Sequence, residues 1–223
     1  MYLKLFAAKM KKYLAEAIGT FALVFCGTGA IVINEVFAGS VGHLGIALTF
    51  GLIVMGMIYA IGDISGAHMN PAVTIGFTLS GTFPVKKVLP YIISQLAGAV
   101  LASLFLRALF PTSVLLGATM PAGSPWQSFI LEIVLTFFLM FTIINVASGS
   151  KETGTMAGLA IGGIVALEAA FAGPVCGASM NPARSFAPAL VSGHFENLWI
   201  YLSAPVIGAA IAIFLFKLLK TLP

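Results

Sequence analysis

Long apolar stretches constrain this chain more than any other feature of its sequence. Hydrophobic residues make up 60% of the 223 residues and charged residues only 8%, and the mean hydropathy is +1.07. A soluble domain carries about 25% charged residues, so this inventory cannot cover a soluble surface. The chain is therefore predicted to be an integral membrane protein. Its first apolar run is too long for a cleaved signal peptide.

Six of the apolar stretches approach the length of about 20 residues that a membrane-spanning helix needs. All lysines fall at the two ends of the chain or in the connections after the second and fourth stretches. By the positive-inside rule, this distribution predicts that both termini are cytoplasmic. The expected spans are residues 13–33, 44–61, 88–110, 129–147, 156–171 and 198–219. The lysines are Lys4, Lys9, Lys11, Lys12, Lys86, Lys87, Lys151, Lys217 and Lys220.

The two halves of the sequence resemble each other. "EAIGTF" at residues 16–21 parallels "EIVLTF" at 132–137, and "LAGA" at 96–99 parallels "VIGA" at 206–209. Each half holds three expected spans, and an odd number of spans forces the halves into opposite orientations. We therefore predict an all-α membrane protein with one domain over residues 1–223. Its inverted repeats would cover about 11–110 and 127–219.

A short polar run ends in Asn-Pro at the equivalent point of each half, in "SGAHMNPAVT" and "CGASMNPARS". Asn is a strong N-cap and Pro suits the first turn of a helix, so helices are expected to begin at Asn70 and Asn181. Too few apolar residues follow for a span, which favours two re-entrant half-helices entering from opposite faces. A single Asn-Pro is usually only a turn, but the duplication argues against that interpretation. Each capping Asn would keep its NH₂ group free to donate into a cavity.

These doubled motifs resemble those of the major intrinsic protein family, the aquaporins and glycerol facilitators. The longer run "GPVCGASMNPARS" is most similar to plant nodulin-type intrinsic proteins and their bacterial relatives. The resemblance covers nearly the whole chain. It implies six transmembrane helices plus two re-entrant half-helices, a single channel domain and a homotetramer with one pore per subunit. It also implies that the pore carries the motif residues Asn70, Pro71, Ala72, Asn181, Pro182 and Ala183.

The resemblance further implies a selectivity filter. Its members would be Phe50, Ala178, Arg184 and a residue of the fifth span, either Val165, which we prefer, or Ala169. Both choices remove the histidine that narrow water channels carry there, which favours a wider filter. Ser185 stands where glycerol facilitators usually carry Asp, which argues the other way.

Glu16 and Glu132 occupy matching positions inside the first and fourth spans. A carboxylate inside a membrane is a functional candidate because it costs about 2.5–3.5 kcal/mol to place there. The pair could relay protons, but its symmetry and the family resemblance favour a supporting role for the re-entrant loops. Glu168 has no counterpart in the first half and would be an anchor for the pore or a loop. Cys176 is a possible target for external mercurials.

The leading functional hypothesis is a passive channel of the cell membrane for water and small neutral solutes such as glycerol or metalloid acids, excluding protons and ions. The alternatives are a strict water channel, a proton-coupled secondary transporter and, less favoured, a gated ion channel. No nucleophile and base are arranged as in an enzyme, so no catalysis or cofactor is expected. The histidines lack metal-ligand spacing. The net charge of +4 reflects membrane topology and predicts no nucleic-acid partner.

Overall fold

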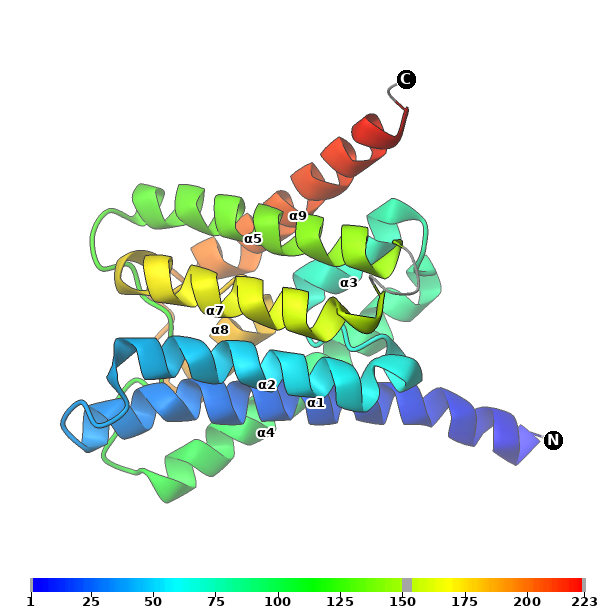
Figure 1. Cartoon of the computed structure of the whole chain (residues 1–223). Helices are drawn as coiled ribbons and strands as arrows, with labels where there is room; N and C mark the ends of the chain where they lie inside the picture. The colour runs from blue at the N-terminus through cyan, green and yellow to red at the C-terminus, as the bar shows by residue number, and fades with distance from the viewer. Residues whose placement is uncertain (1, 150–153, 222–223) are drawn as a thin grey trace.

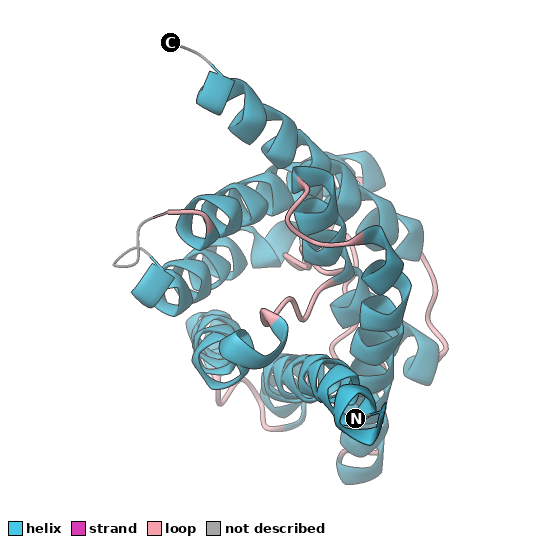
Figure 2. Cartoon of the chain, turned by 90° about the vertical axis from the view of Figure 1, so that its right-hand side faces the viewer, coloured by secondary structure: helices cyan, strands magenta, loops and turns pink. Residues whose placement is uncertain are grey.

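The protein is a bundle of helices, shown in a computed structural model that describes residues 2–149 and 154–221 (Figure 1). Within those residues there is no strand (Figure 2). The elements are α1 (Tyr2–Val36), α2 (Gly42–Ser65), α3 (Pro71–Ser80), η1 (Val85–Lys87), α4 (Val88–Leu109), α5 (Pro125–Ala147), α7 (Ala157–Cys176), α8 (Pro182–Ser192) and α9 (Leu198–Thr221).

Six of these helices are long and apolar enough to cross a membrane, which confirms the predicted number of spans. Most of these helices run longer than the hydropathy pattern indicated, although α4 ends one residue before the expected 110. α7 was expected to end at residue 171, but it continues through Pro174 to Cys176. It ends where Gly177 adopts a φ of 84°, and α2 ends in the same way at Gly66, whose φ is 89°. Only glycine enters this left-handed region without steric cost, so these residues end the two helices.

The remaining helices, α3 and α8, are too short to span. They contain 10 and 11 residues, and at 1.5 Å per residue each covers only about half of a 30 Å hydrocarbon core. Both begin as the sequence predicted. The side-chain oxygen of Asn70 accepts a hydrogen bond from the N–H of Ala72 at 2.8 Å, and that of Asn181 accepts one from Ala183 at 3.0 Å.

Glycines allow the long helices to pack closely. A Cβ atom added to Gly98 on α4 would lie 2.1 Å from the carbonyl oxygen of Ala17 on α1, and one added to Gly208 on α9 would lie 2.3 Å from the carbonyl oxygen of Ile133 on α5. These approaches leave no room for any side chain, so α1 pairs with α4 and α5 pairs with α9 through their backbones. A third pair, α2 with α7, meets at Gly51 and Gly162.

The two ends of the bundle differ. Both chain termini lie at one end, at the right of Figure 1, which we call the terminal end. The connections 37–41 and 110–124 lie at the opposite end, which we call the loop end. The predicted cytoplasmic side corresponds to the terminal end, although Lys151 lies outside the described residues.

Candidate functional site

A cavity lies inside the bundle, between the long helices and the two polar loops that precede α3 and α8. It extends from Ala147 and Ala157, near the terminal end, to Phe50 and Arg184. Most of its wall is apolar, and a few polar groups interrupt that wall. The polar side chains in the lining are His68, Asn70, Ser179, Asn181 and Arg184, and the apolar side chains include Leu23, Phe50, Val54, Ile58, Val73, Phe77, Leu139, Ile143, Ile161, Val165, Ala169 and Ala178.

The two polar loops meet beside this cavity through their asparagines. The amide nitrogen of Asn70 donates to the carbonyl oxygen of Met180 at 2.7 Å, and that of Asn181 donates to the carbonyl oxygen of Met69 at 2.9 Å. The expectation that both NH₂ groups are free was therefore half wrong. An amide nitrogen carries two hydrogens, and one of them joins each loop to the other. The bonds to Met180 and Met69 are the ones that the two amide nitrogens make in the described part of the chain.

Both loops hold non-glycine residues in a strained backbone conformation. The φ angles are 48° at Ala67 and 50° at Met69 in the first loop, and 41° at Ala178 and 53° at Met180 in the second. For a residue with a Cβ atom, the left-handed region costs roughly 1–2 kcal/mol. Each loop therefore needs contacts outside itself to keep this shape.

Glu16 supplies those contacts in the first half. It is fully buried on α1. One carboxylate oxygen accepts the N–H of His68 at 2.9 Å, and the other accepts the N–H of Met69 at 2.8 Å. The second oxygen also accepts the side-chain amide of Gln95 at 2.8 Å. This arrangement uses the carboxylate as an acceptor for two successive backbone groups.

Glu132 makes the same kind of contact in the second half. It is also fully buried, and it accepts the N–H of Ser179 at 2.7 Å and of Met180 at 2.8 Å. Hydrogen bonds to a charged group stabilise a fold by about 1.5–3 kcal/mol each. Because the oxygens of both glutamates are occupied by backbone N–H groups, the geometry favours a supporting role over a proton relay.

Two further residues differ from what the sequence suggested. Glu168 is 2% exposed, and neither of its carboxylate oxygens has a hydrogen-bond partner in the described part of the chain. It therefore does not anchor a loop by hydrogen bonds. Cys176 is fully buried, with its sulfur 3.6 Å from the carbonyl oxygen of Ala172 and 3.4 Å from the N–H of Ala178. This burial argues against a reaction of the Cys176 thiol with external mercurials.

Arg184 is the most confined charged group of the cavity. Its side chain is 2% exposed. One terminal nitrogen donates to the carbonyl oxygen of Gly117 at 2.8 Å, and the guanidinium carbon lies 5.0 Å from the centre of the Phe50 ring. Its Nε has no partner among the described residues. This Nε is buried, so the donors that the guanidinium keeps for another molecule are those of its terminal nitrogens.

Phe50 rests against a glycine of α1. A Cβ atom placed on Gly27 would come within 2.1 Å of the Phe50 ring, so this position has room only for glycine unless the ring moves. The Phe50 ring therefore packs against α1 at Gly27, and the guanidinium of Arg184 lies over the face of the ring.

The structure places both candidates for the fourth filter position, Val165 and Ala169, in the cavity wall. They differ in their level along α7. Val165 lies beside the contacts that Gly51 makes with Gly162 and Ala166. Ala169 lies one turn further along α7.

Six spanning helices around a lined cavity, with two short helices whose capped N-termini meet beside it, define a membrane channel. The sequence matches the family model "Major intrinsic protein" over residues 5–216. Aquaporin NIP1-1 of Zea mays is 46% identical over 212 residues, which cover 95% of this chain and 75% of that protein. Nodulin-26 of Glycine max is 43% identical over 212 residues, covering 95% and 78%.

The fold agrees with a solved structure. The X-ray structure of the aquaglyceroporin from Plasmodium falciparum has a TM-score of 0.86 and covers 95% of this chain and 97% of that one, at 24% identity. The chain belongs to the major intrinsic protein family. It is a passive, multi-pass membrane channel.

Several residues that shape the site escaped the sequence analysis. Tyr91 donates to the carbonyl oxygen of Ser65 at 2.9 Å, and Tyr201 donates to that of Cys176 at 2.8 Å. Each hydroxyl thus binds a carbonyl at the end of the helix that leads into a polar loop. The tyrosines lie shortly before the matching runs "LAGA" and "VIGA", and this repetition could have identified them.

We expect Glu132→Gln to destabilise the second loop. A glutamine can accept only one of the two backbone N–H bonds, and leaving the other buried N–H unpaired costs about 1–3 kcal/mol. The melting temperature of the detergent-solubilised protein should fall, and water permeability in proteoliposomes should fall with it. Glu35→Gln is the matched control, because the carboxylate of Glu35 accepts the Ser113 hydroxyl in a partly buried contact. Equal melting temperatures for the two variants would contradict the supporting role of Glu132.

Proposed function

We propose that Phe50, Val165, Ala178 and Arg184 form the selectivity filter of this channel and that Asn70 and Asn181 bind passing solutes at its centre. The chain is a passive channel for water and small neutral solutes. The observation that carries the filter assignment is the guanidinium of Arg184, which lines the cavity and lies over the Phe50 ring.

The chemistry of this filter suits glycerol as well as water. Arg184 offers donors on one side, while Phe50, Val165 and Ala178 form an aromatic and aliphatic wall. A solute with hydroxyl groups along one edge and carbon along the other leaves no polar group unpaired in such a filter. The small side chain of Ala178 leaves width, and Phe50 limits it. We therefore propose that neutral solutes of the size of glycerol, including boric, silicic or arsenous acid, pass together with water.

The two short helices explain how protons and cations would be excluded. The N-terminus of a helix carries about +0.5 of an elementary charge, and the Asn caps join the N-termini of α3 and α8 beside the cavity. At ~4 Å and an effective dielectric constant near 20, each N-terminus would oppose a cation by about 2 kcal/mol. Together they amount to roughly a 10³-fold disadvantage. Neutral solutes do not meet this barrier.

We propose that the terminal end faces the cytoplasm of the cell in whose plasma or inner membrane the channel lies. The lysines support this orientation through the positive-inside rule. We also propose that the halves 11–110 and 127–219 are inverted repeats, as the paired contacts of Glu16 and Glu132 suggest. Resemblance to the family supports a homotetramer with one pore in each subunit.

The two alternative functions predict different solute fluxes. A strict water channel would exclude glycerol, and a proton-coupled transporter would saturate and follow a proton gradient. The second alternative needs a carboxylate that gains and loses a proton during transport. The backbone N–H groups that occupy Glu16 and Glu132 argue against that role.

Stopped-flow light scattering distinguishes a channel for water and glycerol from a strict water channel. Proteoliposomes mixed with excess external glycerol should shrink as water leaves and then re-swell faster than protein-free vesicles as glycerol enters. Boric acid should give the same second phase. A proton gradient should not alter either rate, and the proton conductance should stay far below the water flux. Re-swelling no faster than in protein-free vesicles, for glycerol and for the acids alike, would show a strict water channel.

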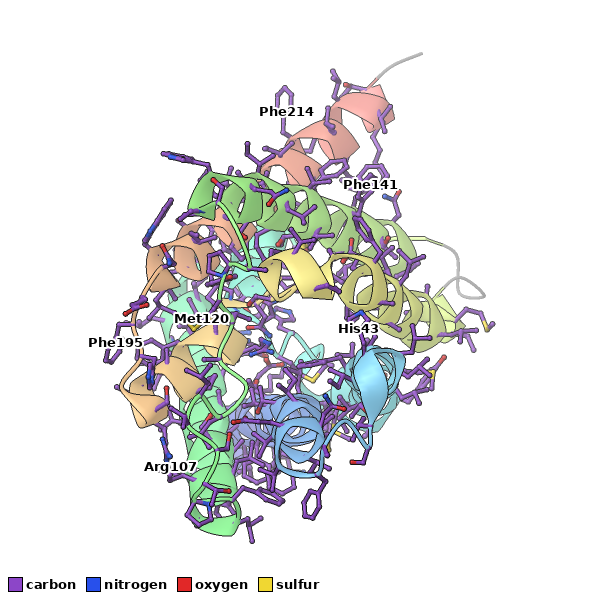
Figure 3. The ribbon with its side chains drawn as sticks, turned by 90° about the vertical axis from the view of Figure 1, so that its left-hand side faces the viewer. His43, Arg107, Met120, Phe141, Phe195 and Phe214 are labelled. Carbon is purple, nitrogen blue, oxygen red and sulfur yellow. The ribbon has the colours of Figure 1, made fainter. Side chains whose placement is uncertain are left out.

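We expect Arg184→Ala to reduce the selectivity of the channel against larger polyols and cations. Removing the guanidinium widens the filter and removes a fixed positive charge, so larger polyols and some cations should enter. Arg107→Ala is the matched control, because Arg107 also donates to a carbonyl of the connection 110–124, that of Ser113 at 3.0 Å. Its side chain projects from α4 at the loop end (Figure 3). Identical polyol permeability and cation conductance in Arg184→Ala and wild type would remove Arg184 from the proposed filter.

We expect Gly27→Ala to narrow the filter. The added methyl group would overlap the Phe50 ring and push it toward the cavity. The ratio of glycerol to water permeability should therefore fall, while the protein still assembles. Gly56→Ala on α2 is the control, since a Cβ atom there has nothing within 4 Å. A ratio that rises in Gly27→Ala, or that falls equally in both variants, would show that the ring does not limit the passage.

A further inference from the structure

A histidine at the loop end binds a backbone carbonyl that a proline has left without its helical donor. Pro174 lies inside α7 and has no N–H, so it cannot bond to the carbonyl oxygen of Ala170, four residues earlier. The Nε2 of His43 lies 2.6 Å from this oxygen. His43 comes from the first turn of α2, and Figure 3 shows its side chain between α2 and α7. The ring thus replaces a missing hydrogen bond of one helix with a donor from another.

The surface of α7 is shaped to receive the imidazole. Gly173 lies beside the ring, and a Cβ atom there would be 3.0 Å from the Cε1 atom of His43. That distance is shorter than ordinary van der Waals contact, so a Cβ atom at this position would require the ring to shift by a few tenths of an ångström. Gly173 therefore leaves space for the imidazole of His43, and Pro174 leaves the carbonyl oxygen of Ala170 free to accept its hydrogen bond.

The two helices that this contact joins carry neighbouring parts of the apolar wall of the proposed filter. Phe50 lies two turns after His43 on α2. Val165 lies on α7, and α7 leads into the loop that holds Ala178. Gly51 and Gly162 bring the helices together at the level of the filter. The His43 contact adds a second point on the loop-end side of it.

We propose that His43 is a positioning residue for selectivity: its Nε2–H, donated to Ala170, holds the loop-end half of α2 against α7 and so fixes the position of Phe50 relative to Val165 in the apolar wall of the filter. This inference rests on the proposed function of those residues as a filter. The neutral Nε2–H tautomer and the imidazolium both supply the donor. Loss of the donor lets the loop-end halves of the helices separate and admits larger solutes.

Two substitutions at His43 separate the donor from the ring. His43→Phe keeps a ring but removes the donor, and it should raise the ratio of glycerol to water permeability about two- to ten-fold, the range that corresponds to one hydrogen bond. His43→Gln retains an N–H donor and should stay close to the wild-type ratio. The matched control is His194→Phe, since the ring of His194 contacts the carbonyl of Ser192 in its own turn. A wild-type ratio in His43→Phe would overturn the proposal.

Pro174→Ala provides a stricter test because it restores an N–H to α7 at the position that can donate to Ala170. In that background, His43→Phe should change the permeability ratio little, since the carbonyl no longer depends on the histidine. An effect of His43→Phe of the same size in both backgrounds would show that the ring acts in another way.

The hydrogen bond can be measured without solute flux. In ¹⁵N-histidine NMR of proteoliposomes at neutral pH, the Nε2 of His43 should carry a hydrogen in the wild type, and its signal should shift in Pro174→Ala. An Nε2 without hydrogen in the wild type would overturn the proposal. If the wild type conducts water but no glycerol, the broader solute range fails, and the NMR result still decides whether the contact between His43 and Ala170 exists.

Discussion

The shape of the cavity depends on the hydrogen bonds that two buried carboxylates accept from two strained loops. Ala67, Met69, Ala178 and Met180 all have positive φ angles, and no regular ladder of backbone hydrogen bonds can hold such a chain inside a membrane. Glu16 and Glu132 each bind two successive backbone N–H groups of a loop. The cost of a carboxylate at this depth is thereby offset by bonds that water would otherwise have to make.

The loops in turn position the short helices, and the second short helix positions Arg184, the charged group of the proposed filter. Asn181 caps α8, and Arg184 follows within the first turn. Its guanidinium then reaches the carbonyl of Gly117 in the connection 110–124. The other filter residues come from long helices, whose spacing depends on glycines. The proposed filter therefore combines one polar side fixed through a loop and one apolar side fixed by helix packing, which would let its width and its polarity vary independently.

The sequence predicted those parts of the protein that depend on local pattern. Six apolar runs gave six spans, and Asn70 and Asn181 begin helices as N-caps do. The predicted ends of α2 and α7 were less accurate, because each helix stops at a glycine in the left-handed conformation and not at a change in hydropathy. Among the tertiary contacts, the support of the loops by Glu16 and Glu132 was inferred from the repeat symmetry and the family resemblance, and others could not be predicted. Nothing in the sequence shows that Gly27 receives Phe50, that Cys176 faces protein, or that each Asn amide binds the opposite loop.

The crossed hydrogen bonds of the two asparagines also bear on how the protein is made. The amide of Asn70 finds its acceptor 110 residues later in the chain, at Met180. At a synthesis rate of about 5–20 residues per second, the ribosome needs on the order of 5–20 seconds to produce that partner. During this interval the first short helix has a cap but no opposing loop. During this time the polar loop of the first half lies in the membrane without its partner loop. The crossed hydrogen bonds that complete the channel therefore form late in biogenesis, when both halves are present.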